Sequence, residues 1–301
     1  MSFFRRIFFF LLINFLVITT ASILASVIMT VFGIKGEWGF YIVFYSLLGF
    51  GGAFISLAMS RYIAKKMMRV RVIDPQTASG QELDLVNMVH QMATQARLPN
   101  KPEVGIYDSP QPNAFATGPS KKKSLVAVSS GLLQSMNREE LEGVVAHEVA
   151  HISNGDMVTM TLLQGMINTM VLLAARFVAK LIVSRMRGRS FWMEHLIFIG
   201  LQVVFMILGS IALCYYSRKR EYRADKDGAR LSSVPNMVSA LKALQRMSSV
   251  GPNPQMAFAG GGTKTESYNY LQISGKAKRA NWFSTHPPLE NRIARLEKLY
   301  S

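Results

Sequence analysis

The sequence predicts a mainly α-helical integral membrane protein with four transmembrane helices and a small β-sheet on the cytoplasmic side. Three observations carry this prediction: four long apolar runs contain no charged residue, basic residues gather at the ends of these runs, and the remaining chain mixes helix and strand patterns. Half of the residues (50%) are hydrophobic and the formal net charge is +16. The hydrophobic residues and the basic residues occupy different stretches of the chain.

Each of the four apolar runs is long enough to cross a bilayer as a helix, which takes about 20 residues. The runs cover residues 7–33, 38–60, 157–175 and 196–217. The first run follows Arg5 and Arg6, as in a signal peptide, but it is too long for the usual apolar region and a second run follows closely. We therefore expect a retained signal anchor. The single cysteine, Cys214, lies in the fourth run, so no intramolecular disulfide is expected.

Basic residues flank the second and fourth runs. They are Arg61, Lys65, Lys66, Arg69 and Arg71 after the second run, and Arg218, Lys219, Arg220 and Arg223 after the fourth. Because cytoplasmic flanks of membrane helices are rich in Lys and Arg, we expect the polar segments in the cytoplasm. We expect this charge to contact anionic lipid rather than nucleic acid. The predicted segments are an N-terminal transmembrane hairpin (1–61), a cytoplasmic segment (62–156), a second transmembrane hairpin (157–217) and a cytoplasmic C-terminal segment (218–301).

The loop of the second hairpin does not follow the charge rule. Residues 184–194 contain Arg185, Arg187 and Arg189, and a loop of this kind favours the cytoplasm. Counting the membrane crossings instead puts the loop outside. The sequence leaves open whether this hairpin spans the membrane completely.

The polar segments carry the helix and strand patterns of a soluble domain. A helix is predicted at 79–97 and another at 234–247, because their apolar residues recur at helical spacing. Asn137 is a good N-cap with Glu140 at the third helical position, so a helix is expected from Arg138. A small sheet is expected from three strands at 104–107, 114–117 and 125–129.

The C-terminal part is expected to contain a loop and a final helix. The Gly-rich stretch at 251–269 lacks the Gly-Lys-Ser/Thr order of a phosphate loop, so no nucleotide site is expected there. The stretch "STHPPLENRIARLEKLY", residues 284–300, breaks at two prolines and then reads as a helix.

The stretch "VVAHEVAHISNGD", residues 144–156, places titratable side chains in an apolar helix. His147 and His151 are four residues apart, so both imidazoles face one side of the helix. This is the H-E-x-x-H arrangement of zinc proteases, in which Glu148 acts on water without binding the metal. The alternative is a pair of buried histidines that hydrogen-bond to neighbouring groups, since an unpaired buried imidazole is costly.

A zinc site of this type needs a third protein ligand and keeps a fourth position open. The best candidate is Glu221, because Glu221, Ala224, Asp225 and Gly228 form one helical stripe of two carboxylates and two small residues. The small residues would let this helix approach the motif helix, and Asp225 could accept a hydrogen bond from a ligating histidine. A solvated charged helix is the alternative.

Four motifs occur in order around the two predicted hairpins: "NAFATG", "HEVAHISNGD", "EYRAD" and "STHPPLENRI". Together they resemble the HtpX-type membrane metalloproteases, which are related to the CAAX prenyl proteases, and the resemblance covers nearly the whole chain. It implies a gluzincin-like α+β metalloprotease domain, one Zn²⁺ per chain, and an active site on the cytoplasmic side of the bacterial inner membrane. It also implies a role in degrading damaged or misfolded membrane proteins.

Carried onto this sequence, the resemblance implies specific residue roles. The metal ligands would be His147, His151 and Glu221, the general base Glu148, and Asp225 and Asn154 would support the ligands. His286 could donate a hydrogen bond to the oxyanion formed during hydrolysis, or it could simply cap a helix. Arg292 could pair with a nearby acidic or carbonyl group. An edge strand for an extended substrate would be formed by Asn113, Ala114, Phe115 and Ala116, although an ordinary turn and strand is also possible.

The expected partners are membrane-protein or unfolded polypeptide substrates and the lipid bilayer, without nucleic acid or nucleotide. Two other functions are open at this point. A CAAX-type prenyl-protein protease would need a chamber for a lipidated peptide. A non-enzymatic membrane protein with a structural metal would fill the fourth metal position with a protein ligand and would not need Glu148.

Overall fold

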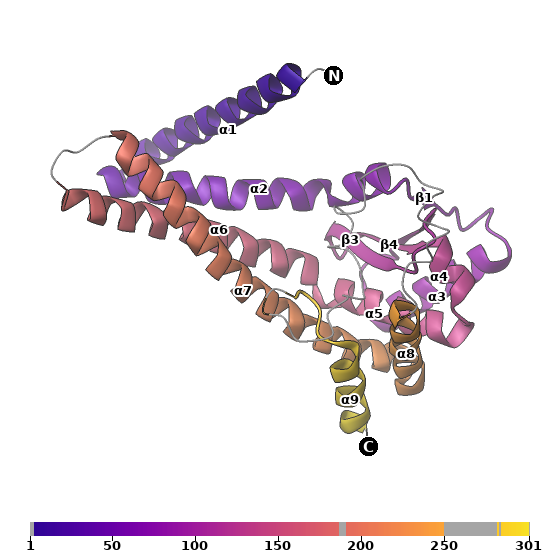
Figure 1. Ribbon diagram of the computed structural model, residues 1–301. Helices are drawn as coiled ribbons and strands as arrows, with labels where there is room; N and C mark the ends of the chain where they lie inside the picture. Colours follow the sequence, from indigo (N-terminus) through magenta and orange to yellow (C-terminus); the bar gives the residue numbers. More distant parts are fainter. Residues whose placement is uncertain (1–2, 187–190, 250–281, 283, 301) are drawn as a thin grey trace. The chain divides into compact units, whose positions relative to one another are not determined.

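The computed structural model describes residues 3–186, 191–249, 282 and 284–300 (Figure 1). The chain forms two compact units, each built from two separate parts of the sequence. The first unit comprises Met1–Ser56 and Thr161–Ser210, and the second comprises Leu57–Met160 and Ile211–Ser301. The Gly-rich stretch at 251–269, for which no nucleotide site is expected, lies outside the described residues, as do Arg187 and Arg189 of the second hairpin loop.

The first unit is made of long helices. They are α1 (Phe3–Phe32) and the parts of α2 (Glu37–Met67), α6 (Asp156–Ser184) and α7 (Phe191–Leu231) that belong to this unit. Helices α2, α6 and α7 are long and apolar enough to cross a membrane, while the part of α1 from Leu16 to Phe32 is apolar but shorter. A multi-pass membrane protein is therefore confirmed, and the fourth span stays a prediction.

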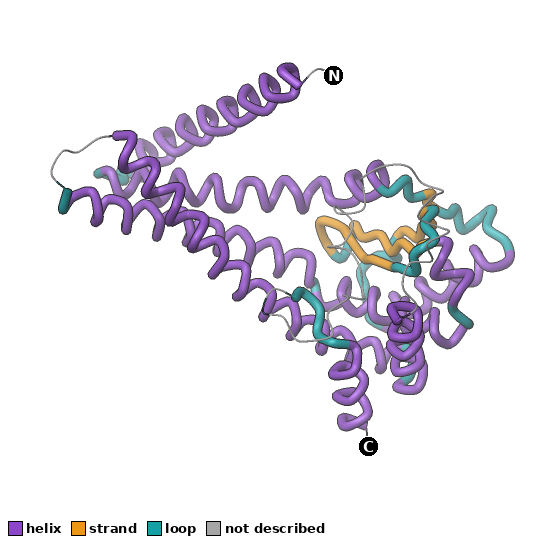
Figure 2. The backbone as a smooth tube through the Cα atoms, in the orientation of Figure 1, coloured by secondary structure: helices purple, strands orange, loops and turns teal. Residues whose placement is uncertain are grey.

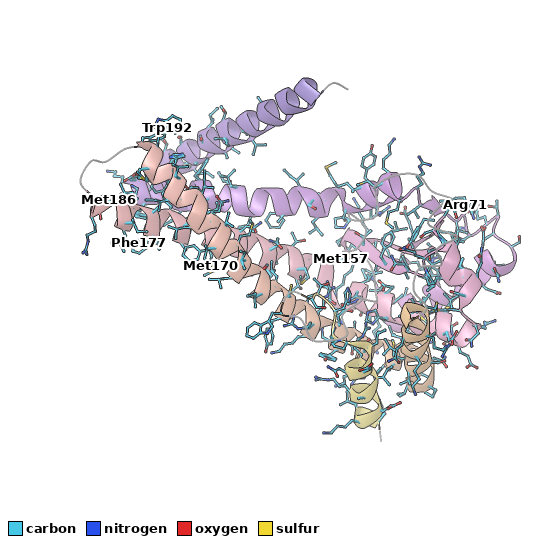
Figure 3. The ribbon with its side chains drawn as sticks, viewed as in Figure 1. Arg71, Met157, Met170, Phe177, Met186 and Trp192 are labelled. Atoms are coloured by element: carbon cyan, nitrogen blue, oxygen red, sulfur yellow. The ribbon has the colours of Figure 1, made fainter. Side chains whose placement is uncertain are left out.

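Large apolar side chains cover the outside of these helices. On α6 and α7, Met170, Phe177 and Trp192 are exposed by 60%, 56% and 75% of their surface, and Figure 3 shows them on the helices. Such a surface would be costly in water but is suited to hydrocarbon, which accepts apolar side chains without penalty. The exposure therefore agrees with the membrane prediction.

A polar cluster joins α2, α6 and α7 at one end of the first unit. Arg176 Nη1 donates to Glu194 Oε1 at 2.8 Å, and Arg176 Nε donates to the Tyr45 hydroxyl at 3.0 Å. Lys180 pairs with Glu37 in the first turn of α2. These contacts place the first turns of α2 and α7 at the same end of the unit. They also explain why α6 continues to Ser184, because each basic side chain has an acidic partner.

The second unit contains a four-stranded mixed sheet, drawn in orange in Figure 2. Its strands are β1 (Arg71–Val72), β2 (Glu103–Tyr107), β3 (Ala114–Ser120) and β4 (Lys123–Ser129), in the order β1-β2-β4-β3. Strand β2 runs parallel to β4, and the two outer pairs are antiparallel. The three predicted strands are confirmed, whereas the two-residue strand β1 was missed. Strand β3 forms an edge of the sheet.

Among the described residues, five helices lie wholly in the second unit: α3 (Gly80–Gln95), α4 (Ser130–Ser135), α5 (Arg138–Asn154), α8 (Val234–Ser249) and α9 (Leu289–Tyr300). The end of α2, the start of α6 and the C-terminal part of α7 also belong to it. Helix α5 is the centre of the core, where Val145 and Val149 are fully buried among the apolar residues of the sheet, α3 and α8. Helices α2 and α7 continue without a break through the predicted segment limits at 61 and 217, so those limits stay predictions.

Local signals define both ends of α5. The Asn137 side chain accepts from Glu140 N at 2.9 Å and the Glu140 carboxylate accepts from Asn137 N at 3.1 Å, which is the predicted capping box. At the other end Gly155 takes a left-handed conformation, with φ of 68°, which is favourable for glycine and costly for most residues. Helix α6 begins at the next residue, Asp156.

Candidate active site

Two imidazoles and one carboxylate from distant parts of the sequence converge in the second unit. His147 Nε2 and His151 Nε2, on α5, lie 3.1 Å apart. Glu221, on α7, brings its Oε2 to 3.4 Å from His147 Nε2 and its Oε1 to 3.4 Å from His151 Nε2. All three residues offer ligand atoms within 4.8 Å of one another, so this group can hold a metal ion.

The close approach of α7 to α5 depends on small residues, as the sequence predicted. A Cβ atom on Gly228 would lie 3.1 Å from the backbone nitrogen of His147 and 2.4 Å from Met237 Cε. Ala224, one turn before, is fully buried. A larger residue at Gly228 would therefore separate the helix that carries Glu221 from the helix that carries the histidines.

His147 is held by a buried aspartate and arginine. His147 Nδ1 lies 3.0 Å from Asp225 Oδ1, the support that the sequence predicted. Arg292, on α9, donates from Nη2 to Asp225 Oδ1 at 2.5 Å and from Nε to Oδ2 at 2.8 Å. Removal of one partner of such a buried pair leaves an uncompensated charge and costs about 3–5 kcal/mol. The fork of Arg292 therefore fixes Asp225, and Asp225 fixes the His147 ring.

His151 is held by a residue that the sequence analysis did not select. Its Nδ1 donates to Asp156 Oδ2 at 2.7 Å, and Asp156 also pairs with Arg223. Asn154, the predicted support, instead donates from Nδ2 to Asp227 Oδ2 at 3.1 Å and makes no hydrogen bond to either histidine among the described residues. The expectation for Asn154 is therefore wrong, because α5 ends at this residue and only the turn at Gly155 brings a carboxylate back to the ring.

Glu221 is fully buried and contacts two more polar side chains. His286 Nδ1 lies 2.9 Å from Glu221 Oε2, and Arg220 Nη2 donates to Glu221 Oε1 at 3.1 Å. The motif "STHPP" therefore reaches the site, although it precedes the last helix of the chain. His286 is a neighbour of the candidate ligand, and its Nδ1 is the atom that this contact uses.

The charges of the site shift the pKa values of its members. Burial lowers the pKa of His147, but hydrogen bonds to Asp225 and Glu221 outweigh it and raise the pKa to about 9. Burial raises the pKa of Glu221, but the charges of His286 and His151 hold it well below its usual range. The same carboxylates that favour a proton on His147 would favour a bound cation, which would compete with the proton for the imidazole.

Glu148 is buried beside the candidate ligands, with 4% of its surface exposed. No hydrogen bond or ion pair joins it to another residue in the described part of the chain, in contrast to Glu221 and Asp225. Its carboxylate is therefore not used to hold the fold together. This is the arrangement expected of a group that exchanges a proton with a substrate or with water.

The predicted substrate strand lies at the edge of the sheet. Ala114 and Phe115 point their side chains into two different buried clusters, and Asn113 is anchored to Ser129 through its backbone. Ala116 is half-buried. Because the side chains of Ala114 and Phe115 are already packed, an extended peptide at this edge would meet the backbone of β3 rather than these two side chains.

The family model of Peptidase family M48 matches residues 79–300 of this chain. This chain belongs to peptidase family M48. It is 47% identical to the "Protease HtpX homolog" of Bacillus pumilus (strain SAFR-032), with 97% of this chain and 99% of the relative covered. It is also 43% identical to "Protease HtpX" of Shewanella oneidensis (strain ATCC 700550 / JCM 31522 / CIP 106686 / LMG 19005 / NCIMB 14063 / MR-1), with the same coverage. The HtpX resemblance is confirmed, and the M48 chain described here is a membrane metalloprotease.

A solved structure shares the fold of this M48 chain. The crystal structure of S. mikatae Ste24p matches with a TM-score of 0.57 at 17% sequence identity, over 97% of this chain and 65% of that chain. The likeness shows a common fold. The chain thus spans about two thirds of the length of that structure, and the small mixed sheet and long helices agree with the fold that the sequence predicted.

Proposed function

We propose that this chain is a zinc endopeptidase of the bacterial inner membrane that degrades damaged or misfolded membrane proteins. In this proposal His147, His151 and Glu221 bind one Zn²⁺, Glu148 is the general base, and His286 assists catalysis. Peptidase membership supports hydrolysis of polypeptides, and three candidate membrane helices support substrates at the bilayer.

The spacing of the three candidate ligands carries the proposal. Zinc binds imidazole nitrogen at about 2.0–2.1 Å and is nearly always tetrahedral, so its ligand atoms lie about 3.3–3.4 Å apart. The three separations in the site are 3.1, 3.4 and 3.4 Å. Both Nδ1 atoms face carboxylates, which leaves both Nε2 atoms directed at the same point. Two imidazoles and one carboxylate also form a usual catalytic zinc set with one position open.

The chain's own residues would perform the remaining steps of peptide hydrolysis. Bound zinc supplies a Lewis acid that polarises a carbonyl and lowers the pKa of water. Glu148 accepts a proton from the attacking water and returns it to the leaving amine, a role that its buried and unpaired carboxylate suits. Asp225 and Asp156 hold the two imidazoles, so the site is rigid before substrate arrives.

His286 would donate a hydrogen bond to the oxyanion that develops on the substrate carbonyl. Its contact with Glu221 Oε2 at 2.9 Å supports this role. In His286→Ala we expect lower turnover at unchanged zinc content. If zinc is lost from this variant, His286 acts by holding Glu221 and the catalytic assignment is wrong.

The substrate would bind as an added strand along β3. Among the described residues this strand ends the sheet and pairs with β4 alone, so an extended chain could pair with its outer backbone groups. Backbone pairing of this kind recognises an unfolded or extended segment with little regard to sequence. It therefore suits an enzyme that acts on misfolded proteins, with Asn113, Ala114, Phe115 and Ala116 as the contact region.

Removal and return of metal test this proposal. Purified full-length protein in detergent should lose cleavage of casein after treatment with a chelator and dialysis, and one equivalent of Zn²⁺ per chain should restore it. The physical reason is that Glu148 alone is a weak base for an attack on an amide. Restoration by Mg²⁺ or Ca²⁺ but not by Zn²⁺ would show another metal, and cleavage that survives complete metal removal would exclude a metal mechanism.

We further propose that the chain crosses the membrane four times, with the second unit in the cytoplasm. Reporter fusions after residues 120 and 301 should both read cytoplasmic. In a Cys214→Ser background, Lys35→Cys and Arg185→Cys should both react with a membrane-impermeant reagent from outside the cell, because the contact of Lys180 with Glu37 puts both turns at one end. Opposite readings from the two fusions would exclude an even number of crossings between them.

A further inference from the structure

Asp156 links a candidate metal ligand to a second helix. It accepts from His151 Nδ1 at 2.7 Å through Oδ2, and its other oxygen, Oδ1, pairs with Arg223. Asp156 is nearly fully buried, with 1% of its surface exposed, whereas the Arg223 side chain is 47% exposed. A buried carboxylate needs both a hydrogen-bond donor and a counter charge, and these two residues supply them.

The contacts from His151 to Asp156 and on to Arg223 connect three helices. Asp156 is the first residue of α6 and follows Gly155, the residue that ends α5. Arg223 lies on α7, two residues after Glu221. Both α6 and α7 are candidate membrane helices. The contact of Asp156 with Arg223 therefore joins the start of one helix to the helix that carries the third candidate ligand.

His151 and His147 are supported in the same way. The His147 ring is backed by Asp225 and then by Arg292. The His151 ring is backed by Asp156 and then by Arg223. A carboxylate on Nδ1 fixes the tautomer and directs the Nε2 lone pair at the metal, and an arginine behind it fixes the carboxylate.

We propose that Asp156 and Arg223 are positioning residues for His151, and that they make metal affinity depend on how α6 and α7 meet. This inference rests on the proposed zinc site. A shift of either helix at this junction would turn the carboxylate, and the imidazole would follow. The competing explanation is that Asp156 only stabilises the start of α6, where a negative charge interacts favourably with the helix dipole.

Zinc affinity of the full-length protein, measured by competition with a chromogenic chelator, separates the two explanations. In Asp156→Asn we expect zinc to bind about 10–100-fold more weakly, the usual effect of losing a residue that supports a metal ligand. Arg223→Gln should weaken binding less, because the arginine acts through the aspartate and is half exposed. Arg223→Lys should restore most of the affinity. In the Asp156→Asn background, Arg223→Gln should have no further effect.

The chain offers a matched control. Asn154, on α5, donates to Asp227, on α7, and Arg230 of α7 pairs with the same carboxylate. These residues form a similar set of contacts next to the proposed one, without a hydrogen bond to a histidine in the described part of the chain. Asn154→Ala and Arg230→Gln should both leave zinc affinity unchanged. If either control weakens zinc binding as much as Asp156→Asn, the effect comes from the helix junction in general and the inference is wrong.

The remaining outcomes are also decisive. Wild-type zinc affinity in Asp156→Asn, with a lower melting temperature of the metal-free protein, would show a helix-start role only and overturn the inference while leaving the proposed zinc site intact. Additive losses in the double variant would show that Arg223 does not act through Asp156. If Asp156→Asn does not fold, the zinc affinities of Arg223→Gln and Arg223→Lys decide between the two explanations, because Arg223 is half exposed and its replacement is tolerated more easily. A wild-type protein that binds no zinc would instead overturn the proposed function.

Discussion

Glu148→Gln is expected to abolish most proteolysis while the protein keeps its zinc. The amide has the shape of the carboxylate but does not accept a proton at neutral pH. General-base catalysis contributes about 10²–10⁴-fold, so cleavage of casein should fall by at least this factor. The fold should not change, because Glu148 makes no hydrogen bond or ion pair with the residues that the structure describes. Any self-cleavage seen in detergent with zinc should stop as well.

The measurement compares turnover and zinc content on the same purified samples. Glu142→Gln is a suitable control, because it places the same change on α5 away from the candidate ligands. It should cleave casein at the wild-type rate. Equal cleavage by wild type and Glu148→Gln would show that another residue is the base.

Glu221→Ala should lose zinc on dialysis against a weak chelator. Loss of a supporting residue already costs about 10–100-fold in metal affinity, so loss of a direct ligand should exceed 100-fold. Glu221→Gln keeps the shape and one of the two oxygens that contact His286 and Arg220, and it should also bind zinc poorly because an amide is a weak ligand. Activity should disappear in both variants.

A matched control again lies on α7. Asp227 lies on the same helix, and its carboxylate accepts from Asn154 and not from the histidines. The Asp227→Ala variant should therefore keep one zinc per chain. Metal content is measured by atomic emission after dialysis. Stoichiometric zinc in Glu221→Ala would mean that a different residue completes the site.

The sequence predicts the parts of this protein that depend on spacing within one element. The H-E-x-x-H motif and the stripe from Glu221 to Gly228 each lie on one helix, and the structure brings both stripes together as expected. Whether these residues bind metal stays a prediction. The capping box at Asn137 was readable for the same reason, since its two partners are three residues apart.

Contacts between different helices could not be predicted from the sequence in the same way. Asp156 was seen in the motif but not chosen, because its carboxylate returns to His151 only through the left-handed turn at Gly155. The pairing of Arg292 with Asp225 joins α9 to α7 and has no local signal beyond the charge itself. The predicted third apolar run, residues 157–175, is shorter than helix α6, which continues to Ser184. The run was ended at Arg176, but the charge of Arg176 is balanced by Glu194 from another helix.

The most direct test of the zinc site is an anomalous difference map from crystals of the wild-type protein, with data collected on both sides of the zinc absorption edge. One strong peak per chain is expected about 2.0–2.2 Å from Nε2 of His147, Nε2 of His151 and a carboxylate oxygen of Glu221, with no other protein ligand. A peak at another place would contradict the assigned ligands. A fourth side chain that closes the coordination shell would identify a structural metal and contradict the catalytic role.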